Sequence, residues 1–451
     1  MRLLAVIPEY PPVYSGGIAT YYKVLFPALA KLGVETKILV PPCNGYAPIE
    51  EIDDKAISVE IINDDRIKRI QNQLHGLSVC TGIRRLLATG WAAYEQTDGG
   101  KGFDLVECTD WGFFYVPWLL APYRPPVVVR LHGSNGQIAF HDGAEQSPID
   151  GTLSQLIEAS LLPRADILTT YSTANQRFWS DQLSRDIDYV PPPLSLSSVD
   201  FSCQKKEEKA IVVGRVQLWK GAKTLCSALE VLGNEAPSIN WIGRSVFSRK
   251  SKLSFDKELS VAYPHVWGSR VKQLPQMLPV EIRRKQTSAR FVLVPSDWDV
   301  FNFTVVEAMA QQAVVICSSG AGASDLIQHG KNGFLFRAKD AVMLADVIRK
   351  VQGMSEKEMK NIGLAARSTV ERLLLPDRVA SLTLEQYRKA LGKEPRKLPE
   401  SDLIAPNLSP EVGQVSASTS LDLCLETLDL KFLTRHVMSR IAKKLHSRLI
   451  P

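Results

Sequence analysis

Short apolar runs, each bounded by glycine or proline, alternate along this chain with longer segments in which apolar residues recur every three or four positions. In the first half the runs occupy residues 3–7, 36–40, 104–107, 127–131 and 167–169, and the first helical segment covers 21–32. Alternation of this kind predicts a parallel sheet covered by helices on both faces, the doubly wound α/β class.

The alternation stops once and then restarts. Three consecutive prolines at 191–193 can continue neither a helix nor a central strand, and a polar segment follows them. Apolar runs return at 210–213, 239–242, 291–294 and 314–317. We therefore expect two doubly wound domains, 1–194 and 195–375, with a helix at about 376–392 crossing back to the first. Two such sheets in tandem place a ligand cleft between the carboxyl ends of their strands.

Length and charge limit the function classes. At 451 residues the chain is too long for a single hydrophobic core. Its 54 Lys and Arg against 48 Asp and Glu give a net charge of +6, but the segment 430–451 alone holds six of these cations and no acid. The body is therefore neutral, and we do not expect nucleic-acid binding, which needs a phosphate-neutralising surface.

Cysteines and hydropathy set further limits. The seven cysteines form no C-x-x-C pair, so we predict neither a metal site nor a disulfide framework. No stretch approaches the roughly 18 apolar residues of a membrane span, and Pro8 and Glu9 interrupt the apolar start. We expect a cytoplasmic protein.

Two adjacent glycines, Gly16 and Gly17, follow the first strand and open a helix. Glycines at such a turn let the backbone approach a ligand closely, and the helix start offers free N–H groups at the positive end of the helix dipole. An anionic ligand such as a phosphate fits this turn. A tight turn that merely needs glycine explains the pattern equally well.

A basic pair occupies the equivalent position of the second half. Arg215 and Lys220 lie five residues apart in the loop between a strand and a helix. Two cations at this sheet edge suit a diphosphate, Arg through its fork geometry and Lys as a point charge. Two solvated basic residues are the alternative.

Two acids flank the start of a later helix. Asp299 lies in the loop after the strand 291–294, and Glu307 lies in the second turn of a helix expected to begin near Asn302. The N–H groups around Phe303 and Thr304 would be free for a phosphate, and each carboxylate can accept hydrogen bonds from vicinal hydroxyls. This arrangement suits a sugar nucleotide. The alternative for Glu307 is a solvated helix face, but its neighbours are apolar and a buried acid needs a partner.

These motifs together resemble the family 4 retaining glycosyltransferases of the GT-B fold, in which two Rossmann-like domains face each other across a donor cleft. The resemblance covers residues 1 to about 392. It implies that the first domain binds the acceptor and the second the nucleotide sugar. It also implies that Gly16 and Gly17 contact the pyrophosphate and that Arg215 and Lys220 hold the diphosphate and stabilise the leaving nucleotide.

The same resemblance assigns the acids. It implies that Asp299 binds the hydroxyls of the transferred sugar and that Glu307 binds those of the ribose. Here the first acid is Asp where the family has Glu, and Asn302 replaces the family's Gly at the phosphate turn. The family's later Gly-Gly-x-x-Glu turn also ends in a shorter acid, Asp325.

Three residues of the first half complete the expected site. His132 and Gly133 end the strand 127–131, and the resemblance implies that His132 hydrogen-bonds the donor sugar near its anomeric centre. A satisfied histidine at a strand end is the alternative. Trp111 could stack on a sugar and Asp110 could bind acceptor hydroxyls. A packed aromatic beside a capping aspartate explains this pair equally well.

The C-terminal region differs from the rest in composition. The Pro- and Ser-rich segment 393–429 is expected to be a flexible tether. Residues 430–451 predict a basic amphipathic helix, with Leu433, Val437 and Ile441 on the apolar side and Arg440 opposite. Such a helix suits an anionic membrane surface, which would make the protein peripheral on the inner face of the membrane. Docking on the protein's own body, or on a partner, is the alternative.

The function expected from these features is transfer of a hexosyl unit from a UDP- or GDP-linked sugar to a glycan, a lipid-linked or another hydroxyl acceptor, with retention of configuration. Arg215, Lys220 and helix N-termini would take the place of a metal, and no cofactor is expected. Two other readings stay open, because fold alone does not define the reaction. One is a sugar-nucleotide epimerase or phosphorylase on the same scaffold, and the other is a scaffold without catalytic activity.

Overall fold

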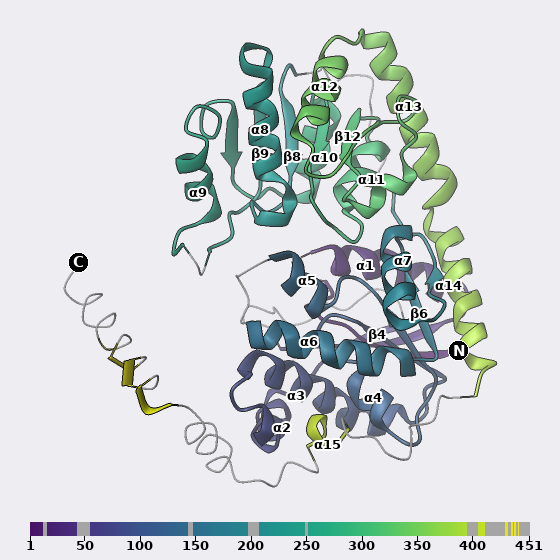
Figure 1. Ribbon diagram of the computed structural model, residues 1–451. Coiled ribbons are helices and arrows are strands. Elements are labelled where there is room, and N and C mark those ends of the chain that lie inside the picture. The colour runs from purple at the N-terminus through teal and green to yellow at the C-terminus, as the bar shows by residue number, and fades with distance from the viewer. Residues whose placement is uncertain are drawn as a thin grey trace.

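The computed structural model describes residues 1–11, 16–42, 55–142, 148–196, 207–248, 251–394 and 405–410, together with scattered positions between 429 and 441. It folds into two lobes that face each other, and a long C-terminal helix returns from the second lobe to the first (Figure 1). Within these residues no helix combines the length and apolarity needed to cross a bilayer. Most of the predicted tether and basic tail lies outside the described residues.

The first lobe is a parallel sheet of seven strands in the order β3-β2-β1-β4-β5-β6-β7. Its strands are β1 Arg2–Val6, β2 Glu35–Val40, β3 Ile57–Ile61, β4 Leu105–Thr109, β5 Val127–Arg130, β6 Ile167–Thr170 and β7 Asp188–Tyr189. The helices between them are α1 Gly17–Ala30, α2 Asp64–Gln73, α3 Thr81–Gln96, α4 Val116–Leu120, α5 Asn135–Asp142, α6 Pro148–Leu161 and α7 Thr173–Leu183.

The second lobe is a parallel sheet of six strands in the order β10-β9-β8-β11-β12-β13. Its strands are β8 Ala210–Val213, β9 Ile239–Ile242, β10 Val271–Leu274, β11 Val292–Val294, β12 Val315–Ser318 and β13 Phe334–Phe336. Its helices are α8 Ala222–Leu232, α9 Phe255–Ala262, α10 Pro279–Ser288, α11 Phe303–Ala310, α12 Ala341–Gln352 and α13 Glu356–Leu373. Two facing doubly wound domains confirm the predicted fold class.

Strand β1 shows why both faces of a sheet are covered. Successive side chains of a strand point to opposite faces. Leu3 and Ala5 pack into a core with helices α1 and α14, Pro376–Leu391, whereas Leu4 and Val6 pack into a second core with α2, α3 and α4. A strand buried on both faces reads as a continuous apolar run, which is the pattern seen in the sequence.

The order of strands reverses between β1 and β4 in the first sheet and between β8 and β11 in the second. Loops at such a switch point diverge and leave a crevice at the carboxyl ends of the strands. The Gly16–Gly17 turn follows β1, and the loop with Arg215 and Lys220 follows β8. The fold thus brings these two predicted loops to the facing edges of the two sheets.

Helix α14 packs on the first domain, where it contacts α1, β4 and β5. A second segment near the C-terminus docks there too. Helix α15, Ala405–Leu408, buries Leu408 among the residues of the second core, and the indole N–H of Trp91 donates to the Leu408 carbonyl at 2.8 Å. The sequence placed these residues in a flexible tether, but contacts that include the buried Leu408 side chain and the Trp91 hydrogen bond hold them on the first domain.

Candidate active site

A cavity of about 390 Å³ lies between the facing edges of the two sheets. It brings together most of the residues predicted from the sequence. Its lining includes Gly16, Gly17, His132, Gly133 and Tyr171 from the first domain and Gly214, Arg215, Trp219, Lys220, Trp298, Asp299, Asn302, Phe303, Thr304 and Glu307 from the second. A larger hollow of about 820 Å³ lies around Lys331, Arg349 and Lys350 of the second domain and contains none of the predicted residues.

The glycine turn lies against the second domain. A β-carbon added to Gly17 would lie 3.1 Å from the ring of Phe303, the first residue of α11. A side chain here would press on the Phe303 ring, and residues at the starts of both α1 and α11 line the same cavity. One donor of α1 is already used, because the backbone N–H of Ala19 donates to the buried Glu9 carboxylate at 3.2 Å. The other N–H groups of this first turn lie at the positive end of the helix dipole, where the sequence predicted a phosphate.

Lys220 and Asp299 form an ion pair in the cavity wall. Each side chain is about one-fifth exposed, at 21% and 19%, so both are shielded from solvent and remain reachable by a ligand. Arg215 lies at the same wall and is exposed. The sequence predicted Arg215 and Lys220 from one motif and Asp299 from another, and the structure shows that Lys220 and Asp299 are direct partners.

Backbone conformation holds the Lys220 loop in place. Gly221 has φ +74°, and a β-carbon on it would lie 1.8 Å from the carbonyl oxygen of Pro295. The loop that carries Lys220 therefore packs directly on the loop that carries Asp299. The Asp299 loop is itself fixed, because the N–H of Asp299 donates to the Gly320 carbonyl at 2.8 Å.

Asn302 keeps the turn shape expected of the family's glycine. Its φ is +73°, in the left-handed region that asparagine tolerates better than most residues. Its side-chain oxygen accepts the N–H of Thr304 at 3.2 Å, and its amide donates to Ser296 at 3.2 Å. Helix α11 begins at Phe303, as predicted to within one residue, but one of the N–H groups expected to be free for phosphate is capped by Asn302.

Glu307 lines the cavity from the second turn of α11, among the buried Val305, Val306 and Ala308. Its carboxylate has no hydrogen-bond partner among the described residues. Burial raises the pKa of Glu307, and the charge of Arg283 partly offsets this effect. The sequence argument that this acid needs a partner therefore points to a partner outside the chain. Paired hydroxyls of a ligand would supply it.

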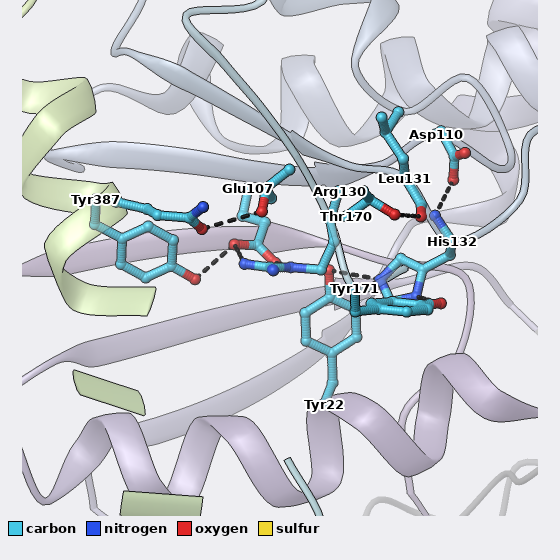
Figure 2. A network of polar contacts seen from close by, with 11 residues as sticks. Tyr22, Glu107, Asp110, Arg130, Leu131, His132, Thr170, Tyr171 and Tyr387 are labelled. Carbon is cyan, nitrogen blue, oxygen red and sulfur yellow. Dashed lines mark hydrogen bonds and ion pairs between the residues drawn. The ribbon is translucent and has the colours of Figure 1, made fainter. Parts of the chain in front are cut away.

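His132 lies at the cavity with both ring nitrogens engaged. Nδ1 lies 2.8 Å from the Tyr171 hydroxyl, and Nε2 lies 3.3 Å from the Tyr22 hydroxyl (Figure 2). Burial and the nearby charge of Arg130 lower the pKa of His132 well below its usual value. The imidazole is therefore neutral at physiological pH.

Asp110 takes a different position from the one expected of an acceptor-binding group. It is fully buried, and its carboxylate accepts the backbone N–H groups of Trp111 at 2.8 Å, His132 at 2.8 Å and Gly133 at 3.1 Å. Burial raises the pKa of Asp110 to about 7. This geometry fits the alternative of a capping aspartate, which here shapes the His132 loop. Trp111 is half-buried beside it and is not among the residues that line the cavity.

Several contacts join the domains around the cavity, and they include a ring stack and a pair of hydrogen bonds. The rings of His141 and Trp298 stack with centroids 4.0 Å apart. Asp325, the shorter acid of the later turn, accepts the N–H and the hydroxyl of Thr173 at 2.8 Å each. Its negative charge lies at the N-terminus of α7, where the helix dipole favours it.

Sequence reasoning missed the groups that support His132. The carboxylate of Glu107 in β4 pairs with the guanidinium of Arg130 in β5, through contacts of 2.9 and 3.1 Å between fully buried side chains. Tyr22 and Tyr387 complete the cluster. A signal was present, because a charged residue inside an apolar parallel strand requires a buried partner.

Comparison with known proteins agrees with the geometry. The domain family described as "Glycosyl transferase 4-like domain" matches residues 16–192, and "Glycosyl transferases group 1" matches residues 199–369. The fold, the cavity and these paired matches define a glycosyltransferase of the GT-B fold. The chain belongs to glycosyltransferase family 4.

Relatives named in the comparisons share this architecture at low identity. A D-inositol 3-phosphate glycosyltransferase of Pseudarthrobacter chlorophenolicus is 23% identical, over 84% of this chain and 91% of that protein. A glycogen synthase of Mycobacterium tuberculosis is 21% identical, over 78% of this chain and 86% of that protein. The solved sucrose-phosphate synthase of Thermosynechococcus elongatus has a TM-score of 0.66 at 17% identity, over 86% of this chain and 99% of that chain. HepE of Anabaena, solved with UDP and glucose, has a TM-score of 0.60 at 17% identity, over 86% and 99% respectively.

Proposed function

We propose that this glycosyltransferase moves a hexosyl unit from a UDP- or GDP-linked sugar to a hydroxyl of a glycan or lipid-linked acceptor, with retention of configuration and without a metal or other cofactor. The observation that carries the proposal is the Lys220–Asp299 ion pair beside Arg215, in the wall of a cavity that the starts of α1 and α11 also face. Cations and helix N-termini stabilise the charge that develops on a departing diphosphate.

The roles divide by position in the cavity. Arg215 and Lys220 grip the diphosphate, and the unpartnered carboxylate of Glu307 accepts the ribose hydroxyls. Asp299, held by Lys220, turns its remaining lone pairs to the hydroxyls of the transferred sugar. The shorter side chain of Asp299 fits this role because the ion pair fixes it at the wall.

Retention follows from the choice of base. The incoming hydroxyl would be deprotonated by a donor phosphate oxygen on the face from which the diphosphate departs. The bond from the acceptor oxygen to the anomeric carbon then forms as the bond to the phosphate oxygen breaks. No side chain acts as nucleophile in this scheme. HepE of Anabaena, which shares the fold, was solved with UDP and glucose, and this supports a sugar nucleotide as the donor class.

The test is release of nucleoside diphosphate by the purified protein from a panel of UDP- and GDP-sugars, with NMR of the anomeric proton of the product. Lys220→Met should lower turnover about 10²- to 10³-fold, the usual effect of removing one transition-state charge partner. Lys223→Met is the matched control, because this exposed lysine lies three residues further on and does not line the cavity. Equal turnover in both variants, or an inverted product, would refute the proposal, and no release from any donor would favour the inactive scaffold.

We also propose that residues 430–451 rest on an anionic membrane surface. The described side chains Leu430, Val437, Met438 and Ile441 are exposed at 78%, 53%, 61% and 48%, so the body of the protein does not cover them. Six basic residues in this segment supply the attraction to anionic lipid. Flotation of the full chain with vesicles rich in anionic lipid should exceed flotation with neutral vesicles and fall on deletion of 430–451. Equal flotation of the full and shortened chains would reject membrane binding through this segment.

A further inference from the structure

A buried chain of polar groups runs from helix α14 to the cavity (Figure 2). At its centre the Glu107 carboxylate receives four contacts. Two come from Arg130, at 2.9 and 3.1 Å, and two come from the hydroxyls of Tyr22 at 2.7 Å and Tyr387 at 2.6 Å. All four side chains are fully buried. Both tyrosines therefore donate their hydroxyl protons to Glu107.

This arrangement determines where the His132 protons lie. A tyrosine hydroxyl has one proton, and Tyr22 gives its proton to a buried carboxylate, the stronger acceptor. Toward His132 the Tyr22 oxygen can therefore only accept. The hydrogen bond of 3.3 Å between Tyr22 and Nε2 then requires the proton to sit on Nε2.

The other side of the ring agrees with this assignment. A neutral imidazole with a proton on Nε2 has a lone pair on Nδ1. The Tyr171 hydroxyl lies 2.8 Å from Nδ1 and can donate to it. Both ring nitrogens are then satisfied, whereas the opposite tautomer would leave Nε2 facing an oxygen that has no proton to give.

The groups around the ring keep it neutral. Arg130 places a positive charge on one side, and the aromatic rings of Tyr21, Tyr22 and Tyr171 surround the imidazole with centroids 5.2 to 5.3 Å from it. The nearest acids are already engaged, Glu107 with Arg130 and Asp110 with backbone N–H groups. Neither is bonded to the imidazole.

We propose that Glu107, acting through Tyr22, is a positioning residue that fixes His132 as the neutral tautomer protonated at Nε2. His132 then offers a ligand in the cavity a hydrogen-bond donor and does not act as a base. The bond from Nε2 to Tyr22 is the longer of the two, so Nε2–H is the less tightly held of the two ring positions. The identity of that ligand rests on the proposed function, whereas the tautomer does not.

Long-range ¹H–¹⁵N correlation NMR of the full chain, labelled at its histidines, tests the assignment directly. The His132 signals are identified by their loss in His132→Gln. We expect a protonated Nε2 and an unprotonated Nδ1 in the wild type. In Tyr22→Phe the constraint is removed and a mixture of tautomers should appear.

Tyr387→Phe is the matched control. It also removes one hydroxyl that donates to Glu107, at 2.6 Å instead of 2.7 Å, but Tyr387 makes no contact with His132. A purely structural role for the cluster would give the same result in both variants. Only the positioning role changes the tautomer in Tyr22→Phe and leaves it unchanged in Tyr387→Phe.

Kinetics give a second readout. In donor hydrolysis the KM for the sugar nucleotide should rise about 3- to 10-fold in Tyr22→Phe, the range for loss of one hydrogen bond, and change less than about twofold in Tyr387→Phe. A wild-type His132 protonated at Nδ1, or an unchanged tautomer in Tyr22→Phe, would overturn the inference. If no sugar nucleotide is turned over, the proposed function fails while the NMR result still decides the tautomer.

Discussion

The ion pair between Glu107 and Arg130 gives the most direct test of how the first domain is stabilised. Both side chains have no solvent exposure and meet through two contacts. Replacing one partner leaves the other charge buried and uncompensated, which typically costs about 3–5 kcal/mol. Arg130→Met and Glu107→Gln should therefore each lower the melting temperature of this domain by roughly 6–20 °C, at about 2–4 °C per kcal/mol for a domain of this size.

The double variant separates this cause from simple loss of packing. Glu107→Gln with Arg130→Met buries no ion, so its destabilisation should be clearly smaller than the sum of the single effects. Lys389→Met is the control, because Lys389 also joins α14 to the sheet, but its pair with Asp188 is partly solvated, at 51% and 22% exposure. It should cost less than about 1 kcal/mol. Scanning calorimetry of the first-domain transition measures all four variants, and additive effects of the two buried changes would refute the reasoning.

Two other predictions follow from single positions. Gly221→Ala should lower stability by more than about 2 kcal/mol and abolish donor turnover, because its side chain would meet the Pro295 carbonyl and move the Lys220 loop. Gly330→Ala, also at positive φ but with no atom within 4 Å, should cost only about 1–2 kcal/mol and keep turnover, and similar losses in both would reject the clash. Burial raises the pKa of Glu307 in the folded protein above its unfolded value of 4.5. The folded state is therefore most stable, as far as this group is concerned, below pH 4.5, where Glu307 is protonated in both states. This stability is lost as the pH rises through the folded pKa. Ligand-free Glu307→Gln should therefore gain stability relative to wild type as pH increases from 4 to 8, measured by thermal melting, while donor turnover falls; a constant difference across this range would contradict the assigned burial.

The fold could be predicted because its signals are local. A buried parallel strand is a short apolar run, and the turn after it needs glycine or a helix cap, so each unit is visible within a few residues. The strand order and the cleft then follow from the general rule for open α/β sheets. The same logic placed Gly17, Lys220 and Glu307 at one cavity from three separate motifs.

The contacts that the sequence did not reveal join residues far apart along the chain. Tyr387 and Glu107 are 280 positions apart, and neither belongs to a motif with a recognisable spacing. Asp110 shows a different limit. The same Asp before Trp fits a ligand-binding or a capping role, and only the three backbone N–H groups that surround its carboxylate distinguish the two.

The two crossings of the chain between the domains meet at one point, and this constrains how the cavity can open. The N–H of Leu194, after the prolines, donates to the carbonyl of Leu374 at 2.8 Å, so both connections lie side by side. Beyond that point α14 is tied to the first domain through the buried Glu107 cluster and must move with it. Opening is then a rotation about the paired crossings, and it must separate contacts between the domains, among them the stack of His141 on Trp298 and the bond of Asp325 to the start of α7. Because Trp298 directly precedes Asp299, separating this stack also moves the loop whose ion pair with Lys220 forms the cavity wall. Donor entry and diphosphate binding therefore depend on the same residues, Trp298, Asp299 and Lys220.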